Sequence, residues 1–149
     1  MINKSKKGNT MRKNATYYCL LFIIGGIGYC LLELLWRGFT DPSMGLAGGI
    51  SFCMLGIIQQ KFKPLRLTYR CILGGLTITA IEMCFGLIFN IYLKRDVWDY
   101  SQLPLNLMGQ ICLLYTVIWC ILSAPMLKLT DDLRKFILRK DLNLNSINN

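Results

Sequence analysis

Residues 15–36, ATYYCLLFIIGGIGYCLLELLW, decide the fold, because they form an apolar run with a single acidic residue, Glu33. The hydrocarbon core of a bilayer is about 30 Å thick, and a helix needs roughly 20 apolar residues to cross it. The run has this length and contains no lysine or arginine. It therefore predicts a membrane-spanning helix.

Three further apolar stretches follow, at about residues 43–60, 71–93 and 105–127. The second is the shortest and is rich in glycine, so it fits either a short tilted helix or a partly re-entrant segment. The sequence thus predicts an all-α integral membrane protein, a four-helix transmembrane bundle formed by residues 15–127.

The composition excludes other classes of protein. The chain of 149 residues is 54% hydrophobic and 17% charged, with a mean hydropathy of +0.43 and a formal net charge of +9. Such a chain would expose large apolar patches in water, and it is too hydrophobic to be disordered. Nucleic-acid binding is disfavoured because the positive charges are not spread over a foldable polar surface.

The basic residues alternate in number along the chain. Of the 17 Lys and Arg residues, only Arg37, Lys94 and Arg95 lie in the first and third connections between the stretches. Because positive charge is retained in the cytoplasm, both termini are expected to be cytoplasmic. The chain then has a basic tail at 1–14 and a basic amphipathic tail at 128–149, where Thr130 is expected to begin a short helix on the inner membrane surface.

A basic segment before an apolar stretch is also typical of a secretory signal. However, residues 15–36 are too many for the apolar core of such a signal, and no small-residue cleavage site follows them. We therefore expect the first helix to be retained in the membrane.

Side chains that usually carry catalysis or bind metals are scarce. The chain has no histidine, and its seven cysteines lie in the apolar stretches without disulfide or metal-site spacing. It also lacks a nucleotide-binding G-x-x-x-x-G-K-[ST] loop and a G-x-S-x-G nucleophile motif. We therefore expect no enzymatic activity, no cofactor and no metal, and any ATP hydrolysis would belong to a separate ATPase subunit.

Two acidic residues within the stretches, Glu33 and Glu82, are the first functional candidates. An acid at the centre of a membrane helix costs about 2.5–3.5 kcal/mol on insertion scales, so it usually faces a partner or a wet cavity. Glu33 can pair with Arg37, four residues later. Glu82 shares one small, polar helix face with Asn90. Both acids fit either a structural role in helix packing or a role in ion, proton or substrate passage.

Glycines are expected to allow close helix packing, because small residues let membrane helices approach each other. The candidates are Gly25, Gly26, Gly45, Gly49, Gly74 and Gly75. The first and third stretches share a Gly-Gly pair followed by a glutamate at the same spacing, and Gly48–Ser51 aligns loosely with Gly109–Cys112. This pattern indicates a parallel 2+2 internal repeat.

The segment that precedes the fourth stretch, WDYSQLPLN at residues 98–106, is expected at the outer membrane surface. Asp99 is a candidate helix cap before the fourth helix. Asn106 and Gln110 would lie on one face at the start of that helix. Capping and anchoring account for these side chains, and binding of a polar molecule near the outer surface is the alternative.

Four segments together resemble a family of small bacterial membrane proteins, the CmpB-type or type IV ABC-transporter permeases. They are ELLWRGFT at 33–40, GGISF at 48–52, WDYSQLPLNLMGQICL at 98–113 and DDLR at 131–134. The resemblance implies a four-span protein of the bacterial cytoplasmic membrane and a role in transport. The sequence departs from the family pattern at Asp41, where that pattern has a histidine.

The sequence therefore favours a permease-like membrane transport component. A polar path would use Glu33, Arg37, Glu82, Asn90, Asp99, Asn106 and Gln110. Since four helices enclose little space, the protein would act in the lipid bilayer as a homo-oligomer or with other membrane subunits. The alternative is a membrane scaffold or regulatory subunit that binds other membrane proteins.

Overall fold

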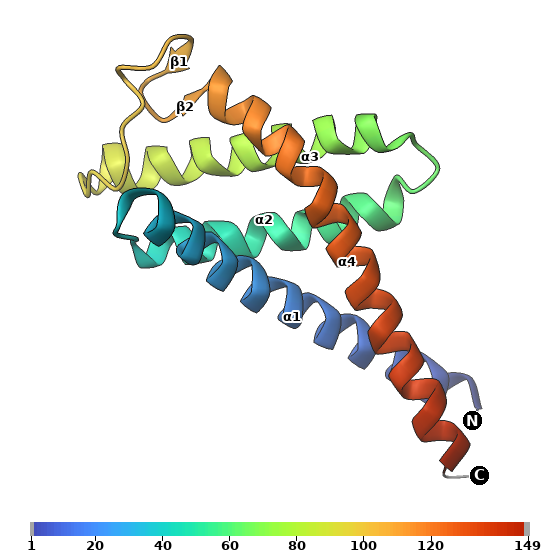
Figure 1. Ribbon diagram of the computed structural model, residues 1–149. Helices are drawn as coiled ribbons and strands as arrows, with labels where there is room; N and C mark the ends of the chain where they lie inside the picture. The colour runs from blue at the N-terminus through green and yellow to red at the C-terminus, as the bar shows by residue number, and fades with distance from the viewer. Residues whose placement is uncertain (1, 148–149) are drawn as a thin grey trace.

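The computed structural model describes the backbone of residues 2–147 and the side chains of residues 11–138. Its main elements are the helices α1 (Ile2–Arg37), α2 (Pro42–Lys61), α3 (Leu67–Phe85) and α4 (Leu113–Ile147) (Figure 1). A π-helix, η1 (Gly86–Tyr92), continues α3. Each of the four helical segments is long and apolar enough to cross a membrane, so the four-helix prediction is confirmed.

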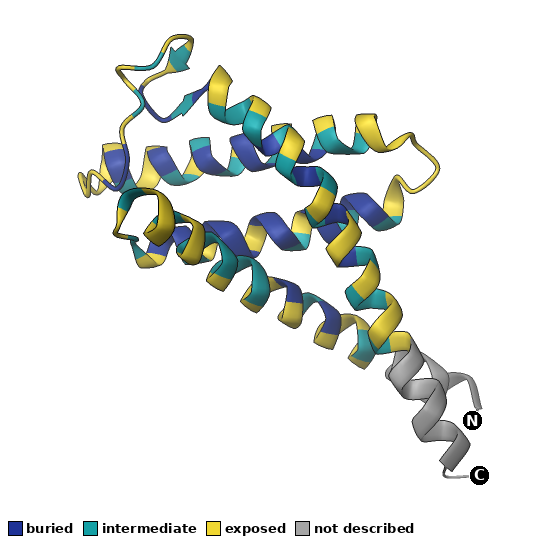
Figure 2. Ribbon diagram, in the orientation of Figure 1, coloured by how far each residue is buried: buried dark blue, intermediate teal, exposed yellow. Residues whose placement is uncertain are grey.

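Helix α2, the least certain span from sequence, is an unbroken helix at the centre of the bundle. It packs against α1, α3 and α4. In the apolar 18-residue stretch of α2, 61% is buried inside the protein, and the mean hydropathy is 1.3. In the corresponding stretch of α1, 11% is buried, and the mean hydropathy is 2.1. The exposed face of α1 is visible in Figure 2. The lower hydropathy of α2 thus accompanies its burial among the other three helices.

The start of α1 and the end of α4 lie at the same end of the bundle as the connection between α2 and α3 (Figure 1). The connections from α1 to α2 and from η1 to α4 lie at the opposite end. The segments that contain most of the lysines and arginines are thus grouped at one end, as the charge pattern predicts. The side chains of the basic residues within 1–10 and 139–149 lie outside the described residues.

The fourth helix begins later than expected. Residues 105–112, predicted to be its first two turns, instead contribute to a small hairpin whose strands β1 (Asn106–Leu107) and β2 (Ile111–Cys112) are antiparallel. Met108 and Gly109 at the turn have positive φ angles of 54° and 70°, which a helix cannot contain. The Asn106 side chain accepts a hydrogen bond from the Gly109 N–H at 3.1 Å and closes the turn.

The terminal tails are also not separate elements. Helix α4 continues without a break through Pro125 and Thr130, so the prediction of a new helix at Thr130 is wrong. The Thr130 hydroxyl donates to the Leu127 carbonyl at 2.8 Å, and the Tyr17 hydroxyl donates to the Thr130 carbonyl at 3.0 Å. Thr130 therefore lies inside α4 and joins it to α1. The expected tail at 1–14 is likewise the start of α1.

Glycine pairs in α1 and α3 make equivalent contacts with the helix that follows each of them. A Cβ atom on Gly26 would lie 2.8 Å from the Gly45 carbonyl of α2, and one on Gly75 would lie 2.6 Å from the Cys120 nitrogen of α4. Helix α1 packs mainly on α2, and α3 on α4. This pairing fits a 2+2 arrangement. The alignment of Gly48–Ser51 with Gly109–Cys112 is wrong, because the latter residues belong to the hairpin.

The other predicted packing glycines also lie in tight contacts. An added Cβ would clash with Phe52 at Gly25, with the Phe22 ring at Gly49 and with Ser123 at Gly74. At Gly45 it would lie 3.2 Å from the Cys30 sulfur. These glycines therefore set the distance between α1 and α2 and the distance between α3 and α4.

Candidate functional site

Glu82 is the most deeply buried acid among the described residues, with 3% of its surface exposed. Its carboxyl group accepts a hydrogen bond from the Tyr29 hydroxyl of α1 at 3.1 Å and one from the Trp119 indole N–H of α4 at 2.9 Å. The two rings stack on each other with their centroids 5.6 Å apart. Three helices therefore meet at one carboxyl group, which neutral donors hold in place.

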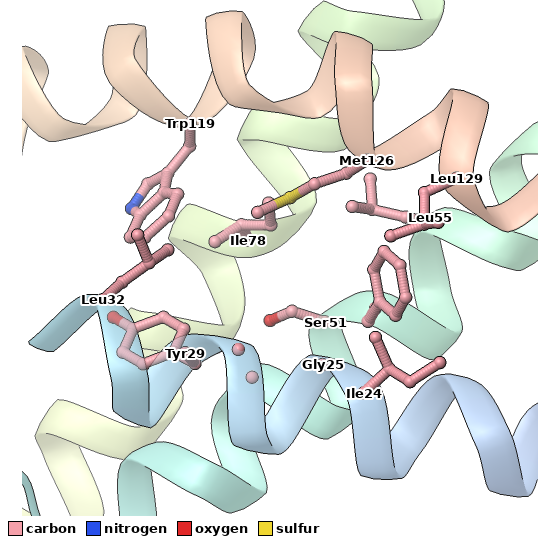
Figure 3. A pocket seen from close by; sticks show the side chains of 13 residues that line it. Ile24, Gly25, Tyr29, Leu32, Ser51, Leu55, Ile78, Trp119, Met126 and Leu129 are labelled. Carbon is pink, nitrogen blue, oxygen red and sulfur yellow. The ribbon is translucent and has the colours of Figure 1, made fainter.

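Tyr29 and Trp119 also line a cavity of about 240 Å³ between the four helices (Figure 3). The other lining residues are almost all apolar. The same two rings thus separate the Glu82 carboxyl group from this cavity. A molecule that enters the cavity would contact the residues that hold Glu82.

A second polar cluster lies at the opposite end of α1 from the N-terminus. The Glu33 carboxylate binds the Arg37 guanidinium at 2.5 Å and accepts a hydrogen bond from the Thr40 hydroxyl at 2.5 Å. Arg37 also donates to the Val97 carbonyl at 2.6 Å. The predicted pair is present, and it additionally ties α1 to the connection between η1 and α4.

Asn90, in the π-helix η1, joins the third helical segment to the loop that follows it. Its amide nitrogen donates to the Trp98 carbonyl and to the Gln110 side-chain oxygen, both at 2.8 Å. Its amide oxygen accepts from the Val97 N–H at 2.7 Å. Trp98 in turn donates its indole N–H to the Gln110 carbonyl at 2.9 Å. Asn90 and Gln110 therefore organise the loop.

We expect Asn90→Leu to loosen this loop, because the change removes three hydrogen bonds and leaves buried partners unpaired. Each unpaired buried group costs about 1–3 kcal/mol. Hydrogen–deuterium exchange should become faster at residues 94–112 and stay unchanged in α1 and α2. Gln102→Leu is the control, since Gln102 is an exposed residue of the same loop and its replacement should leave the exchange unchanged. Equal exchange in the two variants would contradict the role of Asn90.

Asp99 and Asn106, the other predicted path residues, lie apart from these clusters. Asp99 accepts hydrogen bonds from the Ser101 N–H and hydroxyl, both at 2.8 Å, in an exposed turn. It does not cap the fourth helix, because that helix begins only at Leu113. Asn106 donates to the Leu103 carbonyl at 2.7 Å. The predicted path is therefore divided into the Glu82 site, an outer cluster and a local turn.

Asp41 is the N-cap of α2. It accepts a hydrogen bond from the Ser43 N–H at 2.8 Å as an N-cap and forms an ion pair with Arg95 at 2.7 Å. Partial burial raises the pKa of Asp41, but the Ser43 hydrogen bonds and the positive charge of Arg95 outweigh it and leave the pKa below its usual value. A carboxylate therefore serves both the cap and the contact with the outer loop.

Several residues of these sites were not predicted from the sequence. Tyr29 and Trp119 lie far from Glu82 along the chain, and aromatic residues are common in membrane helices, so nothing local marks them. Thr40 follows the predicted Glu33–Arg37 pair and completes it.

Burial raises the pKa of Tyr100, whose neutral ring stacks on the Tyr115 ring with the centroids 4.6 Å apart. Among the described residues, no group of acids and cysteines is placed to hold a metal ion.

The comparisons with known proteins identify the family. A family profile described as "Putative ABC-transporter type IV" matches residues 19–146. The chain belongs to this family. The match begins within α1 and includes all of α2, α3 and η1 and nearly all of α4. The family match therefore covers the residues that form the four-helix fold. Comparisons with curated proteins and with solved structures give no match.

Proposed function

We propose that this type IV protein is the membrane-embedded, permease-like component of a transporter, and that Glu82 takes part in substrate or proton passage. The observation that carries the proposal is the Glu82 carboxyl group, buried where α1, α3 and α4 meet and held by Tyr29 and Trp119. The family description and the four apolar helices support it.

The hydrogen bonds of Glu82 do not by themselves require an acid. A glutamine could accept the Trp119 N–H with its amide oxygen and donate an N–H to the Tyr29 hydroxyl, because a tyrosine hydroxyl both donates and accepts. A carboxyl group in the membrane costs about 2.5–3.5 kcal/mol on insertion scales. An acid is thus a costly choice for packing alone, which favours a role for its charge or its proton.

We propose that the protein works with further subunits. The chain has no nucleotide-binding loop, so a separate ATPase would provide the energy if transport depends on ATP. The cavity of about 240 Å³ between the four helices is too small to be a route across the bilayer by itself. Further copies of the chain, or other membrane subunits, would complete such a route.

The proposed association with an ATPase subunit can be tested by purifying the tagged protein in mild detergent from its own bacterium. We expect vanadate-sensitive ATP hydrolysis to co-elute with the wild-type chain, and all of it to come from a second polypeptide. A matched preparation of an unrelated tagged membrane protein of similar size is the control. A preparation without ATP hydrolysis above this control would contradict the proposed ATPase subunit.

We also propose that the chain lies in the bacterial cytoplasmic membrane with both termini in the cytoplasm, as the positive charges indicate. Single cysteines at Lys63 and Ser101 test this orientation with a membrane-impermeant maleimide. We expect Ser101→Cys to be labelled in intact cells and Lys63→Cys only after permeabilisation, each measured above the label on the parent chain. The reverse pattern would contradict the proposed orientation.

A further inference from the structure

The cavity beside Tyr29 and Trp119 opens on one side of the protein. Its inner wall includes the buried side chains of Phe52, Leu55 and Ile78. Its rim includes Leu32 of α1 and Leu129 of α4, which are 47% and 44% exposed. The cavity therefore opens between α1 and α4.

The opening lies at membrane depth. All residues that line the cavity belong to the four candidate membrane spans. Gly28, on the α1 side, has open space where a side chain would begin, with no atom within 4 Å of an added Cβ. A molecule would therefore reach this cavity from the hydrocarbon phase, where apolar molecules concentrate.

One polar group points into this apolar space. Ser51 of α2 is a buried residue with 6% of its surface exposed, and its hydroxyl is directed into the cavity (Figure 3). The hydroxyls of the buried residues Thr79, Ser123 and Thr130 all donate hydrogen bonds at 3.1 Å or less. The described side chains and backbone offer the Ser51 hydroxyl no such partner. A hydroxyl that faces an apolar cavity in the membrane without a partner costs free energy, which a ligand that bonds to it would recover.

The size of the cavity limits the ligand. A cavity of about 150 Å³ is large enough to bind benzene, and sites for drug-sized ligands start at about 300 Å³. The cavity of about 240 Å³ lies between these sizes. It fits one ring or a short branched chain together with a single polar group.

We propose that this cavity binds a small apolar molecule with one hydrogen-bonding group, such as a substituted phenol, which enters from the lipid between α1 and α4 and bonds to Ser51. The identification of such molecules as transport substrates rests on the proposed function. Binding itself does not, and it can be measured on the purified protein without any transport assay.

Fluorine NMR of the full-length protein in detergent tests the proposal with two probes, para-trifluoromethylphenol and trifluoromethylbenzene. Partition into micelles is not saturable, whereas binding to one site is. We expect saturable binding of one phenol per chain. Gly28→Leu should abolish it by filling the cavity mouth, and Ala80→Leu, on an exposed face of α3 outside the cavity, should not.

Ser51→Ala tests the hydrogen bond. It should weaken binding of the phenol by roughly 2- to 12-fold, the equivalent of one hydrogen bond, and leave binding of trifluoromethylbenzene unchanged. Absence of saturable binding in the wild type, or its persistence in Gly28→Leu, would overturn the proposal. A third outcome would also overturn the proposal: the wild type binds no probe and forms a dimer, and Gly28→Leu dissociates that dimer. A second copy of the chain would then occupy the cavity.

Discussion

Gly75→Ala is expected to destabilise the bundle by about 1–3 kcal/mol, the usual cost of inserting a methyl group into a closely packed interface. The added Cβ would lie 2.6 Å from the Cys120 nitrogen and 2.8 Å from the Cys120 Cα. These are backbone atoms, so no side-chain rotation can relieve the clash. Helices α3 and α4 would have to separate, and the contacts of Glu82 with Trp119 would change with them.

Gly28→Ala is the matched control, because it makes the same chemical change in a membrane helix where nothing lies within 4 Å of the added atom. Unfolding by SDS in mixed micelles, followed by circular dichroism, compares the two variants with the wild type. We expect a lower midpoint for Gly75→Ala and an unchanged or higher one for Gly28→Ala. Equal midpoints would contradict the close α3–α4 contact.

Glu82→Leu is expected to be the most harmful change at the buried acid, whereas Glu82→Gln should preserve the fold. Leucine leaves the Trp119 N–H and the Tyr29 hydroxyl without the acceptor that they share, at about 1–3 kcal/mol for each unpaired group. Glutamine can pair with both. The same SDS unfolding experiment should therefore place Glu82→Gln close to the wild type and Glu82→Leu well below it.

Glu82→Leu combined with Tyr29→Phe and Trp119→Phe is the control for this explanation. The triple variant has no polar group left unpaired at this position, so its stability should recover toward that of the wild type. A triple variant that is even less stable than Glu82→Leu would show that the packing of the rings, not the hydrogen bonds, determines the effect.

The sequence predicts features that depend on neighbouring residues or on overall hydropathy. The four spans follow from the length of each apolar stretch, and the pairing of Glu33 with Arg37 follows from helical spacing. The glycine contacts also follow from the preference of membrane helices for small residues at their interfaces. The polar face of the third helix is likewise explained, since Thr79 bonds to Thr116 and Glu82 to Trp119 of α4.

Features that depend on distant partners could not be predicted. Apolar residues 105–112 have the hydropathy of a helix, but Asn90 of η1 holds the segment from outside through its hydrogen bond to Gln110, and the segment forms a hairpin. Pro104 and Gly109 are residues that favour turns, and they are the local signals for a hairpin in this segment. The partners of Glu82 come from α1 and α4, and the open Ser51 hydroxyl depends on the crossing of four helices. No local pattern contains this information.

We propose that Glu82 serves transport and not only packing. Deletion of the gene, followed by its restoration either as wild type or as Glu82→Gln at equal levels in the membrane, separates the two roles. Mass spectrometry of the compounds taken up from, or released into, the medium then compares the strains. We expect the wild type to restore the parental profile and Glu82→Gln to match the deletion strain. A Glu82→Gln strain with the full parental profile would contradict the claim.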